Sequence, residues 1–341
     1  MTYLRNTWYA AAWSQEVQDR PLARMLLGEP VVFYRDGDGK PVALADRCPH
    51  RFAPLSKGQV VGNALQCPYH GLRYDGSGAC VQNPHGRITE NNRVATYALL
   101  ERWGVIWIWM GAPAASDPAL LPDFSVIADT ENHAVVSGYL KVGAHYQMVA
   151  DNLLDLSHAE YLHPMLGNPD AASRVKFSLK VVGTTVWSIN DWPDEPITPM
   201  WKLMFESPTG RGDRRAHMRW DPPSNLLNDI GFTHCGRPAS EGSSMPNAHL
   251  LTPETERTTH YFWAAARTHK RDDPTIGEKI RQGIDQAFRN EDEPMVQACQ
   301  ERMSSTDVLS LHPVLLPTDV AAVRARRMLA QLIKAEEGAA S

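Results

Sequence analysis

Hydrophobic residues in the first third of the chain come in short runs separated by polar turns. The clearest runs are Pro30–Tyr34, Pro41–Leu44 and Val105–Met110. Apolar runs of this length, bounded by turn residues, are typical of β-strands. Asp36–Gly39 separates the first two runs, and Asp75–Gly78 is a second turn of similar composition. We therefore predict a small antiparallel β domain over residues 1–115.

The pattern changes after a Pro- and Ala-rich stretch, Gly111–Pro118, which we interpret as a linker. Helical spacing of apolar residues predicts helices over Val149–His163, Ile276–Met303 and Asp319–Glu337. Strand-like runs lie between them, at Val181–Ile189, Leu226–Phe232 and His260–Ala265. Residues 116–341 are therefore expected to form an α+β domain in which helices pack against a sheet.

Composition narrows the class of protein. Of the 341 residues, 43% are hydrophobic and 21% charged, which is typical of a soluble globular chain of about two domains. The net charge of −5 and the lack of a long basic run argue against a nucleic-acid partner. The run Val105–Met110 is too short to span a membrane, and Met1–Trp13 does not resemble a secretory signal. Five cysteines, an odd number, favour reduced thiols and a cytoplasmic location.

Two short segments each pair a cysteine with a histidine. Cys48-Pro-His50 is followed after sixteen residues by Cys67-Pro-Tyr-His70. One interpretation is a structural zinc site, but zinc sites usually have both cysteines in one half and both histidines in the other. The alternating order suits a [2Fe–2S] cluster with unlike irons, one held by two cysteines and one by two histidines. We therefore expect a Rieske cluster that transfers single electrons.

A second group of candidate ligands lies in the predicted helix that ends near Pro164. His158 and His163 are five residues apart, so a kink or a helix end near His163 is needed for both to reach one metal ion. Two histidines and a carboxylate form the facial triad of non-haem Fe(II) oxygenases. Asp292 is the best candidate for the carboxylate, although Glu291 and Glu293 flank it.

The sequence also resembles a known family, the Rieske non-haem iron oxygenases of the vanillate O-demethylase and dicamba monooxygenase group. The resemblance covers nearly the whole chain. The segments that carry it are Arg5–Tyr9, Cys48–Leu55, Cys67–Leu72, Asp151–Asp155, Leu251–Glu256 and Glu291–Asp292.

This resemblance implies a helix-grip catalytic domain, a head-to-tail homotrimer, and an NAD(P)H-dependent reductase or ferredoxin as the electron source. It also implies that electrons pass from the cluster of one subunit to the Fe(II) of the next. Asp155 matches the family aspartate that bridges the two centres across the subunit boundary, and Asn152 lies in the same motif. Both are candidate catalytic residues. The alternative for Asp155 is an ordinary carboxylate on a helix surface.

The resemblance further suggests the reaction. Asn228 and His249 match polar pocket positions of the dicamba monooxygenase branch, so both are candidate substrate contacts. The expected reaction uses O₂ to demethylate a small methoxylated aromatic acid, giving a phenol and formaldehyde. One alternative is a ring-hydroxylating dioxygenase. The other is a Rieske electron carrier without catalysis, for which the first 115 residues would suffice.

Overall fold

The computed structural model describes residues 3–171 and 173–340, and its contacts divide the chain into two compact units. The first unit contains the chain up to Leu121, together with Thr252–Thr255 and the segment from Glu336. The second contains Pro122–Leu251 and Glu256–Ala335.

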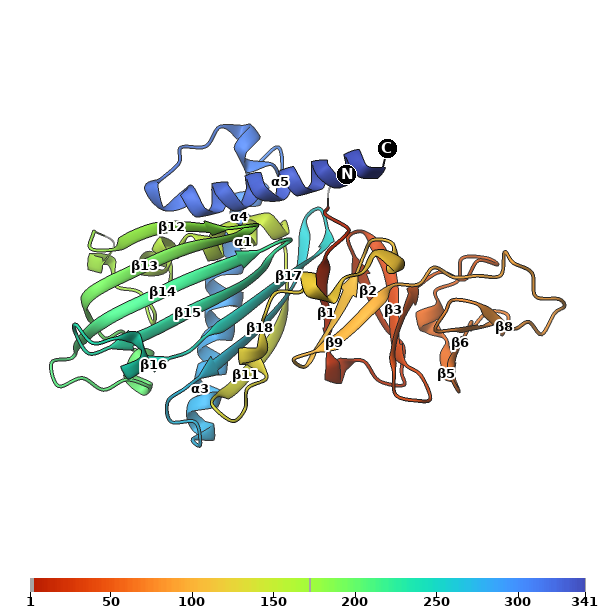
Figure 1. Cartoon of the computed structure of the whole chain (residues 1–341), viewed down its shortest axis with the longest axis horizontal. Helices are drawn as coiled ribbons and strands as arrows, with labels where there is room; N and C mark the ends of the chain where they lie inside the picture. Colours follow the sequence, from red (N-terminus) through yellow and green to blue (C-terminus); the bar gives the residue numbers. More distant parts are fainter. Residues whose placement is uncertain (1–2, 172, 341) are drawn as a thin grey trace. The chain divides into compact units, whose positions relative to one another are not determined.

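The first unit is built from three small antiparallel sheets, with orders β1-β10-β9, β2-β3-β4 and β5-β6-β7-β8 (Figure 1). The strands are β1 (Trp8–Trp13), β2 (Leu22–Leu26), β3 (Glu29–Arg35), β4 (Pro41–Ala45), β5 (Gln59–Val61), β6 (Ala64–Gln66), β7 (Arg73–Asp75), β8 (Cys80–Gln82), β9 (Ala98–Arg102) and β10 (Val105–Trp109). The predicted all-β character of this region is confirmed.

The apolar strand β10 shows why the hydrophobic run is continuous. All five of its residues are buried, so both faces of the strand are covered and no polar position alternates with the apolar ones. The rings of Trp8 and Trp109 meet edge to face with centroids 5.4 Å apart. Aromatic contacts of this kind stabilise the β1-β10-β9 sheet beyond the burial of their area.

The second unit is organised around an eight-stranded sheet of order β11-β18-β17-β15-β14-β13-β12, with β16 pairing β15 (Figure 1). Its strands are β11 (Ala134–Val142), β12 (Lys176–Val182), β13 (Thr185–Pro196), β14 (Arg211–Asp221), β15 (Asn225–Thr233), β16 (Ser243–Ser244), β17 (Asn247–Thr255) and β18 (Thr258–Arg267). The prediction of one strand over Val181–Ile189 was wrong. Gly183, with φ +59°, makes a turn there that separates β12 from β13.

The helices are α1 (Tyr146–Leu154), α2 (Ala159–Leu162), α3 (Pro274–Gln286), α4 (Glu293–Glu301) and α5 (Val320–Ala340), and α3 and α4 run behind the sheet in Figure 1. Short 3₁₀ helices cover Ser14–Glu16, Leu55–Lys57, Pro113–Ala115, Pro118–Leu120, Ser125–Ile127, Leu156–His158, Pro169–Ala171, Trp201–Leu203, Ala239–Glu241, Val308–Leu311 and Pro317–Asp319. Within residues 3–171 and 173–340, no helix is both long and apolar enough to cross a membrane.

Two predicted helices are interrupted, and both interruptions lie at candidate metal ligands. The expected helix over Ile276–Met303 contains a π-helical turn, Ala287–Asp292, between α3 and α4. The expected helix over Val149–His163 breaks at Asp155, where α1 gives way to a 3₁₀ turn and then to α2. π-Helical turns occur frequently at functional sites because they re-aim a side chain.

Candidate metal centres

The two Cys/His segments form loops with the same backbone geometry. In the first, Cys48 donates its N–H to the carbonyl of Ala53 at 2.9 Å and accepts from Phe52 N–H at 2.8 Å. In the second, Cys67 donates to Leu72 at 2.7 Å and accepts from Gly71 at 3.1 Å. The fourth residue after each cysteine has positive φ, +59° at Phe52 and +74° at Gly71. The two loops therefore share the backbone turn that follows each cysteine, although His50 lies two residues after Cys48 and His70 three residues after Cys67.

The four side chains of this candidate cluster site lie at different depths. Cys48 and Cys67 are both 1% exposed, whereas His50 is exposed and His70 half-buried. The two imidazole rings meet edge to face with centroids 4.4 Å apart. Burial raises the pKa of the Cys67 thiol, and the nearby Cys48 raises it further. Two inner thiols and two outer imidazoles match the donor set of a Rieske cluster, in which one iron takes each pair.

The spread of these donors bears on the zinc alternative. A zinc ion holds its ligands at roughly 2.0–2.3 Å, so the ligand atoms must lie within about 4 Å of one another. In the part of the chain that the structure describes, His158, His163 and Asp292 are the one group of three or more such side chains whose ligand atoms all lie within 4.8 Å of one another. For the Cys/His set, the alternating order of cysteine and histidine in the two loops is what favours a two-iron cluster.

The second group is assembled by the two helix interruptions. The break at Asp155 and the end of α2 at His163 bring the rings of His158 and His163 to a centroid separation of 5.2 Å. The π-helical turn ends at Asp292, which is 7% exposed. Asp292 Oδ1 lies 3.4 Å from His158 Nε2 and 3.3 Å from His163 Nε2. The predicted helix end near His163 is thus what allows both imidazoles to face one carboxylate.

The far side of each imidazole is also held. His163 Nδ1 contacts Glu291 Oε2 at 2.6 Å, and His158 Nδ1 contacts the carbonyl oxygen of Asp155. Such contacts fix the tautomer in which Nε2 is free to bind a metal ion. Glu291 therefore orients a histidine and stands outside the three-residue group, and Glu293 accepts instead from Gly143 N–H at 3.3 Å.

Electrostatics at this group follows from burial and charge. Burial alone would raise the pKa of Asp292, but hydrogen bonds and charge interactions with His158 and His163 bring it below its usual value. Burial lowers the pKa of His163, and Asp292 and Glu291 more than offset that effect, so the net shift is upward. A buried carboxylate kept ionised beside two imidazoles suits a divalent cation with open coordination positions, as in a non-haem iron site.

The other two candidates in this motif have different partners. Asn152 donates from Nδ2 to Asp292 Oδ1 at 3.1 Å, which orients the carboxylate. The Asp155 carboxylate caps the following 3₁₀ turn, where its Oδ1 accepts from Ser157 N–H at 3.1 Å and from Ser157 Oγ at 2.6 Å. The bridge between subunits stays a prediction, because a single chain does not contain it.

A cavity adjoins the group and encloses about 840 Å³, the open space at its mouth included. His158, His163 and Asp292 form part of its wall. Most of the remaining wall is apolar and comprises Leu153, Leu156, Leu166, Met200, Trp201, Ala216, Met218, Ile230, Met245, Ile284 and Phe288. An apolar cavity wall with a few polar groups is typical of a small-molecule site.

Asn228 and His249 both line this cavity and are 6% and 4% exposed. Burial lowers the pKa of His249 to about 3 and raises that of Tyr261 well above its ordinary value. His249 is therefore neutral and Tyr261 keeps its proton, and the Tyr261 hydroxyl and His249 Nδ1 share a hydrogen bond of 2.7 Å. When the hydroxyl donates to Nδ1, the proton of the neutral imidazole lies on Nε2. The Nε2 of His249 has no partner in the protein, and Asn228 Oδ1 likewise has none.

Sequence reasoning missed three features of this site. The orienting role of Glu291 could have been suspected from its position next to Asp292, since histidine ligands usually bond a second carboxylate. Trp192 and Arg214 also line the cavity, but no local motif marks them.

Comparison with known proteins agrees with this geometry over the whole chain. Residues 7–98 match the Rieske [2Fe-2S] domain, and residues 142–335 match the vanillate O-demethylase oxygenase C-terminal domain. The chain is 37% identical to the oxygenase component of dicamba O-demethylase from Stenotrophomonas maltophilia, over 98% of this chain and 99% of that protein. It is also 37% identical to the oxygenase component of chloroacetanilide N-alkylformylase from Rhizorhabdus wittichii, over 98% and 97% of the two chains.

A solved structure agrees equally well. Dicamba monooxygenase bound to 3,6-dichlorosalicylic acid superposes with a TM-score of 0.92 at 37% identity, covering 99% of each chain. The two-domain α+β prediction is confirmed by this match, as are the expected [2Fe–2S] cluster and mononuclear iron as cofactors. The chain therefore belongs to the vanillate O-demethylase family of Rieske non-haem iron monooxygenases, as an oxygenase component.

Proposed function

We propose that this oxygenase removes the methyl group of a small methoxylated aromatic acid, releasing a phenol and formaldehyde. The observation that carries the proposal is the apolar cavity, which is lined both by the His158/His163/Asp292 group and by His249, whose Nε2 has no partner in the protein. An aromatic ring fits the apolar wall, and a carboxylate accepts from His249. The relatives named for demethylation and dealkylation support the same reaction class.

The assignment of residues to the two centres is part of the proposal. Cys48, His50, Cys67 and His70 hold the cluster within a domain of residues 1–115. His158, His163 and Asp292 hold the iron within a domain of residues 116–341. When bound, the cluster supplies single electrons and the iron supplies O₂ activation.

The remaining steps belong to the protein. Glu291 and the Asp155 carbonyl hold the imidazoles in one tautomer, Asn152 holds Asp292, and the apolar wall excludes bulk water from the methyl group. In balance, the methyl ether, O₂, two electrons and two protons give the phenol, formaldehyde and water. An NAD(P)H-dependent reductase or a ferredoxin is the proposed electron donor, and the name "oxygenase component" of the relatives supports a separate donor.

The proposed assembly is a homotrimer in which Asp155 links the cluster of one subunit to the iron of the next. The position of Asp155 in the chain supports this role, because Asp155 is the N-cap of the 3₁₀ turn that carries His158. A carboxylate bonded to two imidazoles would keep both oriented across the boundary.

The test is a screen of methoxybenzoates with the purified oxygenase, a compatible reductase and NADH. Consumption of O₂ that depends on substrate, with formaldehyde formed in equal amount, is the expected result. A cis-diol product would indicate a ring-hydroxylating dioxygenase instead. Reduction of the cluster with no O₂ consumption for any compound would indicate an electron carrier.

A further inference from the structure

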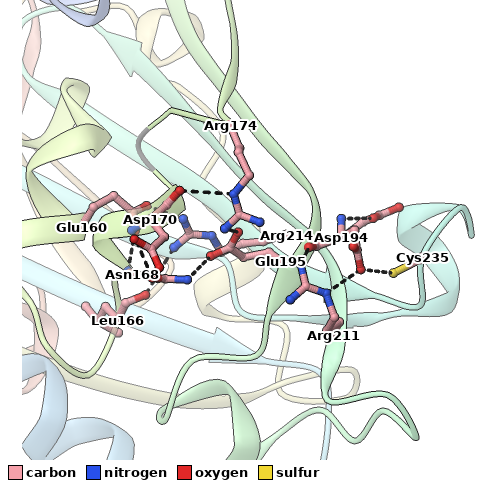
Figure 2. Close-up of polar contacts among 11 residues, drawn as sticks. Glu160, Leu166, Asn168, Asp170, Arg174, Asp194, Glu195, Arg211, Arg214 and Cys235 are labelled. Carbon is pink, nitrogen blue, oxygen red and sulfur yellow. Dashed lines mark hydrogen bonds and ion pairs between the residues drawn. The ribbon is translucent and has the colours of Figure 1, made fainter.

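Beside the cavity lies a network of ionic side chains, buried except for Arg174, which is shown in Figure 2. Glu160 accepts from Arg214 Nη2 and, at 2.5 Å, from the backbone N–H of Asn168. Glu195, fully buried, accepts from Asn168 Nδ2 at 3.0 Å and from Arg174 Nη2 at 2.7 Å. The network therefore contains two guanidinium groups and two carboxylates, bridged by one amide.

Arg214 is the member of this network that lines the cavity. Its Nη2 binds Glu160, its Nη1 donates to the carbonyl of Leu166 at 3.3 Å, and its Cζ lies 3.8 Å from the ring centroid of Trp192. The guanidinium is thus fixed on three sides. Its Nε–H, in a side chain 5% exposed, has no partner in the protein.

Trp192 is a second cavity-lining residue with a buried N–H that has no partner. It lines the same cavity, is 2% exposed, and its Nε1–H also has no partner in the protein. Buried N–H groups almost always have a hydrogen-bond partner in native proteins. Two such donors, stacked on one another at the wall of a substrate cavity, therefore indicate a partner supplied by the substrate.

The sheet register separates this donor pair from the His249 end of the cavity. Trp192 pairs with Arg214 across β13 and β14, whereas Asn228 pairs with Met218 of β14. Arg214 and Met218 are four residues apart, which is about 13 Å along a strand. Ala216 lies between them on the same face and leaves that stretch of the wall apolar. The cavity thus has two polar ends joined by an apolar middle.

Charge indicates which kind of group fits the Arg214 end. Each guanidinium of the network is paired with a carboxylate, so the network as a whole is balanced in charge. Burial raises the pKa of Glu195 above its usual value, Arg214, Asn168 and Arg174 offset part of that rise, and Glu195 Oε2 lies 2.7 Å from Arg174 Nη2. A negatively charged group of the substrate at this end would lie near Glu160 and Glu195. No unpaired positive charge of the network would offset the resulting repulsion.

We propose that Arg214 and Trp192 form a specificity site for an uncharged oxygen acceptor, such as a carbonyl, at the end of the substrate opposite its carboxylate. The inference rests on the proposed function, since it takes the carboxylate to lie near His249. It adds that the preferred substrate is an aromatic acid substituted at both ends of the ring.

The test measures binding by calorimetry to the metal-loaded oxygenase, so that it does not depend on turnover. The probes are 4-acetyl-3-methoxybenzoate and its 4-isopropenyl isostere, which has the same shape but no acceptor oxygen. The variant is Trp192→Phe, which removes the Nε1–H and keeps a ring beneath Arg214. The matched control is Trp187→Phe, on the same strand but on the opposite face and outside the cavity lining.

Wild type is expected to bind the acetyl compound about 2- to 10-fold more tightly than the isopropenyl compound, the range expected for one neutral hydrogen bond. Trp192→Phe should reduce that preference, and Trp187→Phe should keep it. Because the wild-type comparison needs no variant, the inference stays testable if Trp192→Phe does not fold. A third probe, 2-methoxyterephthalate, carries a carboxylate at both ends and should bind more weakly than the acetyl compound.

Equal binding of the acetyl and isopropenyl compounds by wild type would overturn the inference and leave the proposed function standing. Tighter binding of the dicarboxylate would also overturn it, because the end would then be an anion site. Failure of wild type to bind any of the three benzoates would contradict the proposed substrate class, and the specificity site with it.

Discussion

The two candidate metal centres are built in opposite ways. The cluster site comes from two short loops, each closed by its own backbone hydrogen bonds between Cys48 and Ala53 and between Cys67 and Leu72. The candidate iron site is assembled from the residues at the two ends of α2 and from the π-helical turn, which are distant in sequence, and its candidate ligands Asp292 and His163 are buried. A site carried by local loops can therefore be lost or kept independently of the second unit. A site assembled by the fold depends on every element that positions it.

The largest expected effect is at the cluster. Cys67→Ser should abolish the visible absorption and the reduced-state EPR signal of the cluster, because the hydroxyl replaces a thiolate ligand. The mononuclear iron of the second unit should stay bound, because its proposed ligands lie outside the two Cys/His loops. Cys80→Ser is the matched control, since Cys80 is buried in the same unit but outside both loops. Retention of both signals in Cys67→Ser would show that the ligand assignment is wrong.

The next effect concerns the His249 end of the cavity. His249→Ala should weaken binding of a methoxybenzoate by about 10- to 150-fold, the value of one hydrogen bond to a charged group. Both metal contents should be unchanged. His217→Ala, on the opposite face of the sheet, should bind normally. If an uncharged methoxyarene loses as much affinity as the acid, His249 has a structural role and the carboxylate contact is wrong.

A similar or smaller effect is expected at Glu291, which contacts the proposed iron ligand His163. Glu291→Gln should lower the affinity for Fe(II) by about 10- to 100-fold, because His163 Nδ1 loses its charged partner at 2.6 Å. The cluster absorption should be unaffected. Glu293→Gln is the control on the same turn and should keep wild-type affinity. Equal iron affinity in both variants would remove Glu291 from the site.

The smallest effect is a pH dependence of stability in the second unit. Burial lowers the pKa of His145 to about 3, and Arg326 adds to that shift. The unfolded chain therefore binds a proton near pH 6.5 that the folded chain rejects, so the free energy of unfolding falls as pH falls from 6.5 toward 3. In urea unfolding, His145→Phe should show a shallower acid slope than wild type. The exposed residue His269 supplies a control, and His269→Phe should leave the slope unchanged.

The sequence predicted the local features of the molecule better than the features that depend on the assembled fold. The spacing of Cys48, His50, Cys67 and His70 is a local pattern, so the chemistry of the cluster could be inferred before any fold was known. The continuous apolar run of β10 likewise identified a buried strand. Pro164 marked the helix end that lets His163 turn toward His158.

Features that depend on long-range packing could not be predicted in this way. Helical spacing over Ile276–Met303 gives no sign of the π-helical turn, and the contacts of Asp292 with His158 and His163 join segments that are far apart in sequence. Arg214 and Trp192 meet only through the register of β13 and β14. The turn at Gly183 divides the predicted strand Val181–Ile189 into parts of β12 and β13.

The most direct test of the central claim is the iron and acid-labile sulfide content of Asp292→Ala beside wild type. Two independent centres predict about three irons and two sulfides per chain in wild type, and about two of each in the variant, with an unchanged cluster spectrum. Iron that remains at about three per chain, or loss of iron and sulfide together, would contradict the account.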